Sequence, residues 1–488
     1  MAPTVPAPHL DGRMLIGGHR VDAISGDWFE TRDPSNGRPL TRVAQGDRRD
    51  VDAAVETARE AFTRVWSKTA PLKRVHILNR LAALIREHRA DVAALESLDV
   101  GKPLREAEAD AEAAAQFFEY FAGAADKIFG ASIPLGPNML DYTVREPLGV
   151  SAQIVPWNYP LRLACRGIAP ALACGNTVVA KPAGEAVLST LRIAELALEA
   201  GLPHGVLNVV TGHGQVAGAA LAGHPGINQV TFTGSVPTGI AVMKAAADHV
   251  VPVTLELGGK SPNIVFADAD LAHAGASAAR VILQNAGQTC TAPSRLLVEK
   301  QAHAEVLEHA AEVMRRMRLG RGLDNPDMGP VISEPQMTRI LEYVHTGVKE
   351  GGRVVTGGTR ADQDGLRDGY FVRPTLIDQV APGTTVEQEE IFGPVLTVTT
   401  FESVEEAIAI ANGTPYGLVT GIWTRDLHRA LKVATEVKAG QIRINGYSAE
   451  GSAHLPFGGY KKSGFGREQG MEAIAAYTQV KNVMINFG

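Results

Sequence analysis

Cys290 is a candidate nucleophile because of the residues that surround it. It lies in VILQNAGQTCTAPSR (281–295), where an apolar helical run leads toward the cysteine and Pro293 precedes a strand-like segment. Thr289 and Thr291 place hydroxyl groups on both sides of it. The thiolate is the reactive form of cysteine, so this residue needs a nearby base or surroundings that favour ionisation. A cysteine considered alone is more often a small buried hydrophobe.

Glu256 and Asn158 are of types that could assist such a nucleophile. Glu256 interrupts the apolar strand-like segment TLELGG (254–259), and burial of a carboxylate raises its pKa toward the range of a general base. Asn158 is held between Pro156 and Pro160, and its amide could stabilise an oxyanion together with the backbone N–H of Cys290. The alternatives are a carboxylate that backbone amides satisfy and an ordinary turn asparagine.

Three further positions are suited to bind a phosphate or a ribose. GSVPTG (234–239) follows a strand and opens a helix, so its amides and the Ser235 hydroxyl could bind phosphate, although its spacing is not GxGxxG. Lys181 ends the strand-like NTVVAKP, and Glu390 with Phe392 could hold a ribose and a planar ring. Taken singly, these are also a tight turn, an exposed lysine and a strand entry.

The elements that must position these residues alternate between strands and helices. Strand-like runs occur at 150–156, 176–182, 206–212, 229–235 and 251–257, with helical runs between them. Strands that are apolar throughout and joined by helices predict a parallel sheet buried on both faces, which binds ligands at the carboxyl ends of its strands. A second set from 263 to about 445 predicts a second α/β domain.

Two other regions complete the chain. The helical pattern from about 50 to 127 begins at Asp50-Val51-Asp52, which offers an N-cap. The segment 133–145 reads as a hairpin around Gly136-Pro137-Asn138, and 477–487 as a last strand. A hairpin that leaves the domain body needs cover for its edges, so we expect an oligomer contact there.

Composition limits the classes of function. The chain has 488 residues, 45% hydrophobic and 20% charged, with a formal net charge of −6. These values indicate a soluble protein of two or three domains and argue against nucleic-acid or membrane partners. No secretory signal or membrane-length apolar run is present, and the three cysteines show no disulfide or metal-site spacing. We therefore expect a cytoplasmic protein without a bound metal.

Seven motifs in order carry a family resemblance. They are PWNYP (156–160), KPA (181–183), FTGS (232–235), ELGGKSP (256–262), GQTC (287–290), EIFGP (390–394) and PFGGYKKSGFGRE (456–468). This series resembles the NAD(P)-dependent aldehyde dehydrogenase superfamily from about residue 15 to the C-terminus.

The resemblance implies an α/β fold with three parts. A Rossmann-like dinucleotide-binding domain would comprise residues 1–128 and 148–256, and a second α/β domain, the catalytic one, residues 257–455. A small β oligomerisation element would comprise residues 129–147 and 470–488. Members of the family usually assemble as dimers or tetramers, so a homodimer or homotetramer is expected.

The resemblance also assigns roles in catalysis. Cys290 would attack the aldehyde carbonyl to give a thiohemiacetal, and hydride would pass to the nicotinamide. Asn158 and the Cys290 amide would hold the oxyanion. Glu256 would activate the water that hydrolyses the resulting thioester to the carboxylic acid. A covalent hemithioacetal is a hydride donor, and its oxidation leaves an activated acyl group.

The expected cofactor is NAD, and the expected contacts come from several motifs. They are Ile154, Pro156, Trp157, Lys181, Gly184, Gly234, Ser235, Leu257, Gly258, Glu390 and Phe392. Many members that prefer NAD carry a glutamate where this chain has Gly184. Without that carboxylate nothing there repels a 2′-phosphate, so NADP use is also expected unless Glu185 substitutes.

Substrate contacts are expected from Tyr159, Arg166, Thr289, Thr291 and Phe457. Arg166-Gly167 replaces a Trp-Lys pair common in the family, which removes a lysine proposed to relay protons with the glutamate at Glu468. Arginine is suited to bind carboxylates, and it would repel the cation of betaine aldehyde unless Glu450 faces the tunnel.

Two alternatives share the fold. One is a CoA-acylating semialdehyde dehydrogenase, which the presence of Glu256 as a water activator disfavours. The other is a non-catalytic, crystallin-like protein, which the presence of Cys290, Glu256 and Asn158 together disfavours.

Overall fold

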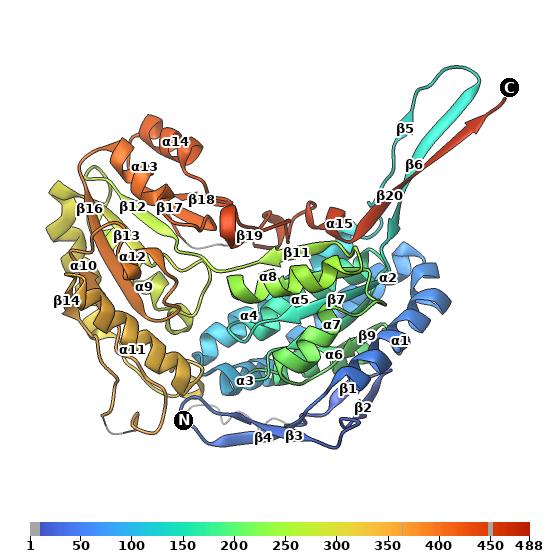
Figure 1. Cartoon of the computed structure of the whole chain (residues 1–488), viewed down its shortest axis with the longest axis horizontal. Coiled ribbons are helices and arrows are strands. Elements are labelled where there is room, and N and C mark those ends of the chain that lie inside the picture. Colours follow the sequence, from blue (N-terminus) through green and yellow to red (C-terminus); the bar gives the residue numbers. More distant parts are fainter. Residues whose placement is uncertain (1–9, 364, 448–451) are drawn as a thin grey trace.

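Two sheets surrounded by helices form the body of the protein, and a long ribbon of strands projects from it (Figure 1). This computed structural model describes residues 10–363, 365–447 and 452–488. The predicted α/β class is confirmed. Among the described residues, no helix combines the length and apolar character that a membrane span requires.

The first sheet has eight strands in the order β19-β11-β10-β7-β8-β9-β1-β2. Its five central strands run parallel, and β19 and β1 join the two edges antiparallel. The five strand segments predicted between 150 and 257 are all present. The strands are β1 (Met14–Ile16), β2 (His19–Val21), β7 (Val150–Val155), β8 (Thr177–Pro182), β9 (Leu207–Val209), β10 (Gln229–Thr233), β11 (Val253–Glu256) and β19 (Gly464–Phe465).

Both faces of this sheet are covered, as the apolar strands require. Along β8, Val178 packs into one core cluster, whereas the next residue, Val179, packs into another on the opposite face. The helices that surround the sheet are α1 (Arg48–Arg64), α2 (Pro71–Glu87), α3 (Arg89–Val100), α4 (Leu104–Ala124), α5 (Pro160–Ala173), α6 (Leu188–Glu199), α7 (Ala219–Ala222) and α8 (Val236–Ala247).

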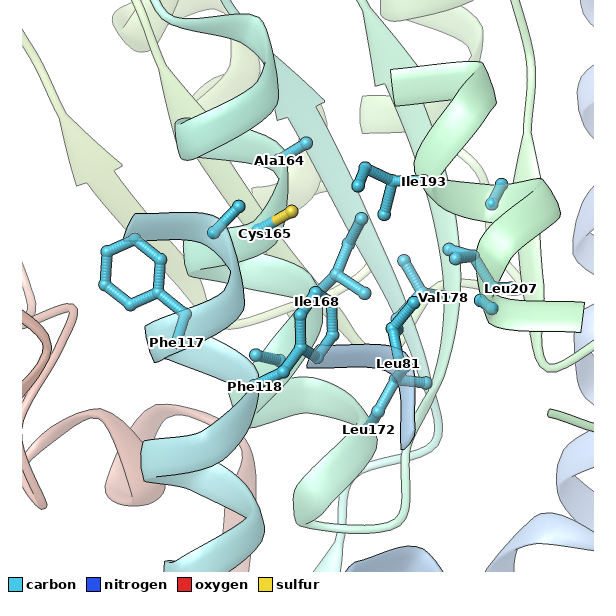
Figure 2. Packing of buried hydrophobic residues seen from close by; sticks show 14 of the residues in the cluster. Leu81, Phe117, Phe118, Ala164, Cys165, Ile168, Leu172, Val178, Ile193 and Leu207 are labelled. Carbon is cyan, nitrogen blue, oxygen red and sulfur yellow. The ribbon is translucent and has the colours of Figure 1, made fainter. Parts of the chain in front are cut away.

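Figure 2 shows the core on the α5 side of the sheet. Phe117 and Phe118 from α4 pack beside Ile168 and the thiol of Cys165 from α5. Cys165 is fully buried, and burial raises the pKa of its thiol. This cysteine is therefore a core residue, in contrast to Cys290.

The start of α1 differs from the prediction. Asp47, and not a residue within 50–52, is the N-cap, and its side chain accepts a hydrogen bond from the Arg49 backbone N–H. Asp50 completes the cap from inside the helix, because its carboxylate accepts the backbone N–H of Asp47 at 2.9 Å. The aspartate three residues before the predicted cap therefore sets the first turn.

The second sheet has seven strands in the order β14-β15-β16-β13-β12-β17-β18, all parallel except β14. They are β12 (Pro262–Val265), β13 (Arg295–Glu299), β14 (Arg353–Thr356), β15 (Thr375–Asp378), β16 (Val395–Phe401), β17 (Val419–Trp423) and β18 (Gln441–Ile444). The accompanying helices are α9 (Leu271–Ile282), α10 (His303–Arg316), α11 (Glu334–Lys349), α12 (Thr385–Gln388), α13 (Val404–Asn412) and α14 (Leu427–Glu436).

The projecting ribbon joins segments far apart in the chain (Figure 1). β5 (Ser132–Ile133) and β6 (Met139–Pro147) form the predicted hairpin, and β20 (Thr478–Asn486) pairs antiparallel with β6 along its whole length. The short helix α15 (Ala473–Ala476) leads into β20. Near the N-terminus, β3 (Trp28–Arg32) and β4 (Pro39–Ala44) form a separate hairpin.

Candidate active site

The backbone turns sharply before Cys290. Helix α9 ends at Ile282, earlier than the sequence suggested, because Asn285 and Ala286 adopt left-handed φ angles of 48° and 53°. Gly287 follows with a φ of 75°, where its missing Cβ also allows the Gly393 carbonyl to approach. The left-handed angles of the non-glycine residues Asn285 and Ala286 store strain, which is frequent beside functional groups.

Cys290 is half-buried and lies in the wall of a cavity of about 440 Å³. Six residues singled out from the sequence line the same cavity, namely Asn158, Tyr159, Arg166, Thr289, Thr291 and Phe457. Burial raises the pKa of the Cys290 thiol to about 12, although Arg166 and the Thr291 backbone N–H act in the opposite direction. The thiol is therefore neutral at pH 7, and it needs a base before it can attack.

Asn158 directs its amide toward the cysteine loop. Its Nδ2 donates to the Gln288 backbone carbonyl at 2.9 Å, and the backbone carbonyl of Asn158 accepts from Asn285 Nδ2 at 2.7 Å. These two bonds fix the loop after β7 against the loop that carries Cys290. The backbone N–H of Cys290 donates to no acceptor in the described parts of the chain. It and the second Nδ2 hydrogen of Asn158 remain for an oxygen in the cavity.

Gly259 brings the first sheet against the cysteine loop. A Cβ on this residue would lie 2.4 Å from the carbonyl oxygen of Cys290. Real Cβ atoms do not approach an oxygen so closely, so only glycine fits between the end of β11 and this loop. Glycine here sets the position of Cys290 relative to Glu256, three residues earlier in the chain.

Glu256 is a buried carboxyl group without a hydrogen-bond partner. It ends β11, is 2% exposed, and neither oxygen finds a donor in the described parts of the chain. Burial raises its pKa well above the ordinary value, and the nearby Glu468 adds to this effect. Glu256 is not in the cavity wall, yet its charge raises the pKa of Cys290, so the two groups are near each other.

Arg166 forms a buried ion pair with Glu468. Its Nη2 also donates to Thr233 Oγ1 at 3.2 Å, and its guanidinium lies 4.9 Å from the centre of the Phe457 ring. Gly167 follows because a Cβ there would lie 2.0 Å from the Gln153 side-chain oxygen. Arg166 therefore reaches the cavity wall with its charge already matched by a carboxylate.

The other predicted substrate residues form a polar and aromatic wall. The Tyr159 hydroxyl hydrogen-bonds Thr289 Oγ1 at 2.9 Å, and the Tyr447 hydroxyl donates to the Thr291 carbonyl at 2.9 Å. Phe457 packs in a small apolar cluster against which Cys290 lies. Glu450 lies outside the described residues.

Glu390 and Phe392 meet the end of the first sheet from the second. Glu390 accepts the Gly259 backbone N–H at 3.0 Å, and a Cβ on Gly258 would lie 2.3 Å from its Oε2. Burial raises the pKa of Glu390 to about 7. The Phe392 ring stands edge-on to Trp157, with ring centres 5.3 Å apart.

The remaining predicted cofactor positions follow the carboxyl ends of β7, β8, β10 and β11. In the sheet register, Ile154 lies beside both Phe232 and Lys181, and Pro156 follows β7. Lys181 is 2% exposed and has no ion pair among the described residues, and burial lowers its pKa to about 8. Gly184 lies beside the Phe29 ring, which an added Cβ would approach to 3.5 Å.

The start of α8 supplies free backbone amides at the same edge. Ser235 is the N-cap of this helix of 12 residues, and its Oγ contacts Thr238 Oγ1 at 2.9 Å. The Gly234 N–H donates to the Glu256 carbonyl at 3.0 Å, whereas Leu257 packs against Gly239 of the helix. The predicted cofactor residues from four strand ends are thus gathered at one edge of the sheet.

Sequence reasoning missed Arg443 and Arg162, which both line the cavity. Arg443 lies in β18 and Arg162 in the first turn of α5. The only sequence signal for Arg443 was the alternation of Gln441 and Arg443 with Ile442 and Ile444, which places the two polar side chains on one face of a strand. Nothing in that alternation indicates that the face borders a cavity.

Comparisons with known proteins identify the family. The model of the aldehyde dehydrogenase family matches residues 21–483. Hydroxyisobutyraldehyde dehydrogenase of Mycolicibacterium austroafricanum is 43% identical over 474 residues, which cover 97% of this chain and 93% of that protein. Human retinaldehyde dehydrogenase 3 is 43% identical over 481 residues, which cover 98% and 93%.

Solved structures show the same fold. Betaine aldehyde dehydrogenase of Staphylococcus aureus in complex with NAD⁺ has a TM-score of 0.96 at 39% identity, covering 98% of this chain and 95% of that one. The P. syringae indole-3-acetaldehyde dehydrogenase mutant with NAD⁺ and IAA has a TM-score of 0.96 at 41% identity, covering 99% and 98%. The family match spans nearly the whole sequence, and both sheets are included in these superpositions. The chain therefore belongs to the aldehyde dehydrogenase family.

Proposed function

We propose that this enzyme oxidises an aldehyde to the carboxylic acid with Cys290 as its nucleophile. The observation that carries the proposal is the position of the Cys290 thiol in a cavity wall beside the free amide hydrogen of Asn158. A small aldehyde in this cavity can bring its carbonyl carbon to the sulfur and its oxygen to the amide donors. Such donors stabilise the oxyanion as it forms.

Side chains of the site can transfer each proton of this reaction. The Cys290 sulfur adds to the carbonyl carbon, the thiol proton goes to a base, and Glu256, a buried carboxyl group that acts electrostatically on Cys290, is the candidate for this base. A nicotinamide dinucleotide supplies the oxidant when bound, by accepting the hydride from that carbon. After Glu256 has passed the thiol proton to solvent, it takes a proton from water, and the resulting hydroxide releases the acyl group as a carboxylic acid and the Cys290 sulfur as a thiolate. The proton held by Glu256 then restores the thiol.

The carboxyl edge of the first sheet fits a dinucleotide. Lys181 is a buried cation without an ion pair, and the amides that open α8 attract phosphate. Gly258 leaves room for the Glu390 carboxylate, which with Phe392 and Trp157 would contact a ribose and a ring. Ile154, Pro156, Leu257 and Gly234 would complete the walls. NAD is the expected cofactor, as in the relatives solved with it.

NADP should be used as well. Gly184 offers no carboxylate to repel a 2′-phosphate, and His213 lies close to this position. Glu185 is exposed and acts on Lys181 electrostatically, so it is the residue that would weaken NADP binding.

Hydrolysis is favoured over transfer of the acyl group to CoA. The Glu256 carboxyl group, which has no hydrogen-bond partner among the described residues and acts electrostatically on the nucleophile, is poised to activate water. Nothing favours a non-catalytic protein, because the cysteine, carboxylate and amide are all in place.

We assign residues 1–128 and 148–256 to the cofactor domain, 257–455 to the catalytic domain, and 129–147 with 470–488 to an oligomerisation element. Apolar side chains on the ribbon support the last assignment, since Val480 is 57% exposed and Met484 61%. A homodimer or homotetramer that covers them is expected. Three free cysteines fit a reducing cytoplasm.

Steady-state oxidation of a panel of aldehydes with NAD and with NADP tests the function. We expect acid as the product without CoA, turnover with both cofactors, and loss of turnover in Cys290→Ala while cofactor binding is retained. Cys165→Ala, which alters a cysteine buried in the core, is the matched control and should keep activity. Turnover by Cys290→Ala at the wild-type rate would contradict the proposal.

A further inference from the structure

We propose that Arg443 binds an anionic group at the far end of the substrate, so that the preferred substrates are aldehydes that also carry a carboxylate. The inference rests on the proposed function, because it places the aldehyde group of the same molecule at Cys290. Arg443 and Cys290 line one cavity, and Cys290 acts electrostatically to raise the pKa of Arg443.

The fold directs Arg443 into the cavity. It lies in β18, the edge strand of the second sheet, where side chains alternate between two faces. Ile442 packs into the core on one face, whereas Gln441 and Arg443 form part of the cavity wall on the other. The strand is therefore a fixed support for the guanidinium, and no rearrangement is needed to present it.

Most of the hydrogen-bonding capacity of Arg443 is unused. Its Nη2 donates to Gln441 Oε1 at 3.1 Å, and its Nη1 donates to the Tyr447 carbonyl. A guanidinium has five N–H donors, so three have no protein acceptor among the described residues. The group also lies over the Tyr447 ring, 5.2 Å from its centre, which holds its plane in place.

The positive charge of Arg443 is also unmatched. In the described parts of the chain it forms no ion pair with a carboxylate, although it is half-buried. Burial lowers its pKa, and the positive charge of Arg162 lowers it further, so a second cation is close by. A buried charge without a partner is costly, and an anion bound to Arg443 would reduce that cost.

The other charged groups of the cavity are already engaged. Arg166 is paired with Glu468, and Asp110 is bound by Lys102 at 2.7 Å. Glu106 accepts the Asn285 backbone N–H at 2.8 Å, and burial raises its pKa to about 7, which reduces its negative charge near neutral pH. Arg443 is thus the cation of this wall that is available for a planar carboxylate, which arginine binds with two parallel N–H donors.

Paired substrates test the proposal directly. We would compare kcat/KM for 4-oxobutanoate and 5-oxopentanoate with kcat/KM for their methyl esters and for butanal and pentanal. The wild type should favour the acid over its ester by about tenfold or more, and the dicarboxylate product should inhibit competitively. Arg443→Gln should lower the acid-to-ester ratio by about 10- to 100-fold, as expected for a hydrogen bond to a charged group.

Two further variants separate binding from folding. Arg443→Lys keeps the positive charge but lacks the two parallel N–H donors of arginine. Its acid-to-ester ratio should therefore lie between those of the wild type and Arg443→Gln. Arg425→Gln removes an exposed arginine in the loop after β17 and should leave the ratio at the wild-type value. Thermal unfolding of each variant shows whether it folds. If Arg443→Gln does not fold, Arg443→Lys still tests the proposal, because a wild-type acid-to-ester ratio in this variant would contradict it.

The outcomes distinguish this inference from the proposed function. Oxidation of butanal without any preference for the acids would overturn the anion site and leave the dehydrogenase function in place. An acid preference that is unchanged in Arg443→Gln would also overturn it. Failure to oxidise every aldehyde would overturn both.

Discussion

Burial acts in the same direction on the two reactive groups of the site. It raises the pKa of the Cys290 thiol to about 12 and raises the pKa of Glu256 well above its ordinary value, so both groups hold their protons. An aldehyde dehydrogenase needs each of them deprotonated at some step. Burial of the Glu256 carboxyl without a hydrogen-bond partner among the described residues is unfavourable for folding, but it leaves both oxygens available to act as a base.

Replacement of Glu256 by glutamine isolates the hydrolytic step. We expect a rapid burst of reduced cofactor that approaches one equivalent per site, followed by a steady state about 10²- to 10⁴-fold slower, since general-base catalysis contributes this much. Stopped-flow absorbance of the reduced cofactor and intact-protein mass spectrometry would detect the burst and the acyl-enzyme. A steady-state rate equal to that of the wild type would remove Glu256 from the mechanism.

The pH dependence provides a control within the same experiment. Because the pKa of Glu256 is raised, acid protonates this base at a higher pH than it would an exposed glutamate. Wild-type deacylation should therefore rise with pH until Glu256 is ionised, whereas deacylation of Glu256→Gln should lack that rise. Parallel profiles would mean that another group titrates.

The reactive residues could be predicted from sequence, but the anion site could not. Glu256 breaks an apolar strand and Asn158 is fixed between prolines, so each stands out locally. Arg443 lies between two isoleucines, and such alternation of polar and apolar residues is ordinary for an edge strand. Its significance comes from a cavity formed by α4, α5 and the cysteine loop. The lining residues of these segments all lie more than 150 residues before Arg443 and meet it only in the folded chain, because the last of them is Ala292 (443 − 292 = 151).

At the scale of elements, strands were easier to predict than the ends of helices. The parallel strands are short, apolar and bounded by turn residues, which is why all five in the first sheet were found. The end of α9 was placed too late, because Asn285 and Ala286 continue an apolar helical pattern but adopt left-handed φ angles. Contacts of that loop with Asn158 and Gly393 outweigh the local helical preference.

The contact between β11 and the cysteine loop should be sensitive to a single methyl group. In Gly259→Ala the new Cβ would have to move away from the Cys290 carbonyl, which lies 2.4 Å from its ideal position. We expect destabilisation of about 1–3 kcal/mol, the usual cost of overpacking. A shift of the nucleophile by about 1 Å should also lower kcat/KM by about 100-fold.

Gly123→Ala is the matched control, because this glycine is exposed in α4 and an added Cβ would contact nothing. It should keep full activity and gain about 0.5–1 kcal/mol, since alanine is preferred in helices. Chemical denaturation and kcat/KM measured on both variants would check the pair. Equal activity of the two alanine variants would show that the loop position does not depend on Gly259.

At the scale of the whole molecule, neither sheet holds a complete site. The first sheet supplies Glu256 and, through the loop after β7, Asn158, whereas the second supplies the cysteine loop, Glu390 and β18. After the second sheet is complete, the chain returns to the first sheet, where β19 pairs with β11 at the edge. The sequence indicated two α/β units, but the pairing of β19 with β11 has only two residues and no pattern that predicts it.

The ribbon has exposed apolar side chains and strand edges that a monomer would leave uncovered. β20 pairs with β6 over nine residues and yet exposes Val480 and Met484 on one face. The ribbon projects from the body (Figure 1). A ribbon of this length without a partner also leaves unpaired backbone groups at its edges. Both features are relieved if a second copy of the chain packs against it.

Lysines at these two positions should therefore dissociate the oligomer. We expect the double variant Val480→Lys with Met484→Lys to sediment as a smaller species than the wild type, because burial of two charges without partners costs more than the lost apolar contact alone. Its Tm should fall and depend on protein concentration. The control is Leu427→Lys, which changes an equally exposed leucine on α14 and should keep the wild-type assembly. Sedimentation velocity of all three proteins checks this prediction. A wild-type protein that sediments as a monomer would show that the ribbon does not join subunits. The same conclusion would follow if the double variant sedimented at the same rate as an oligomeric wild type.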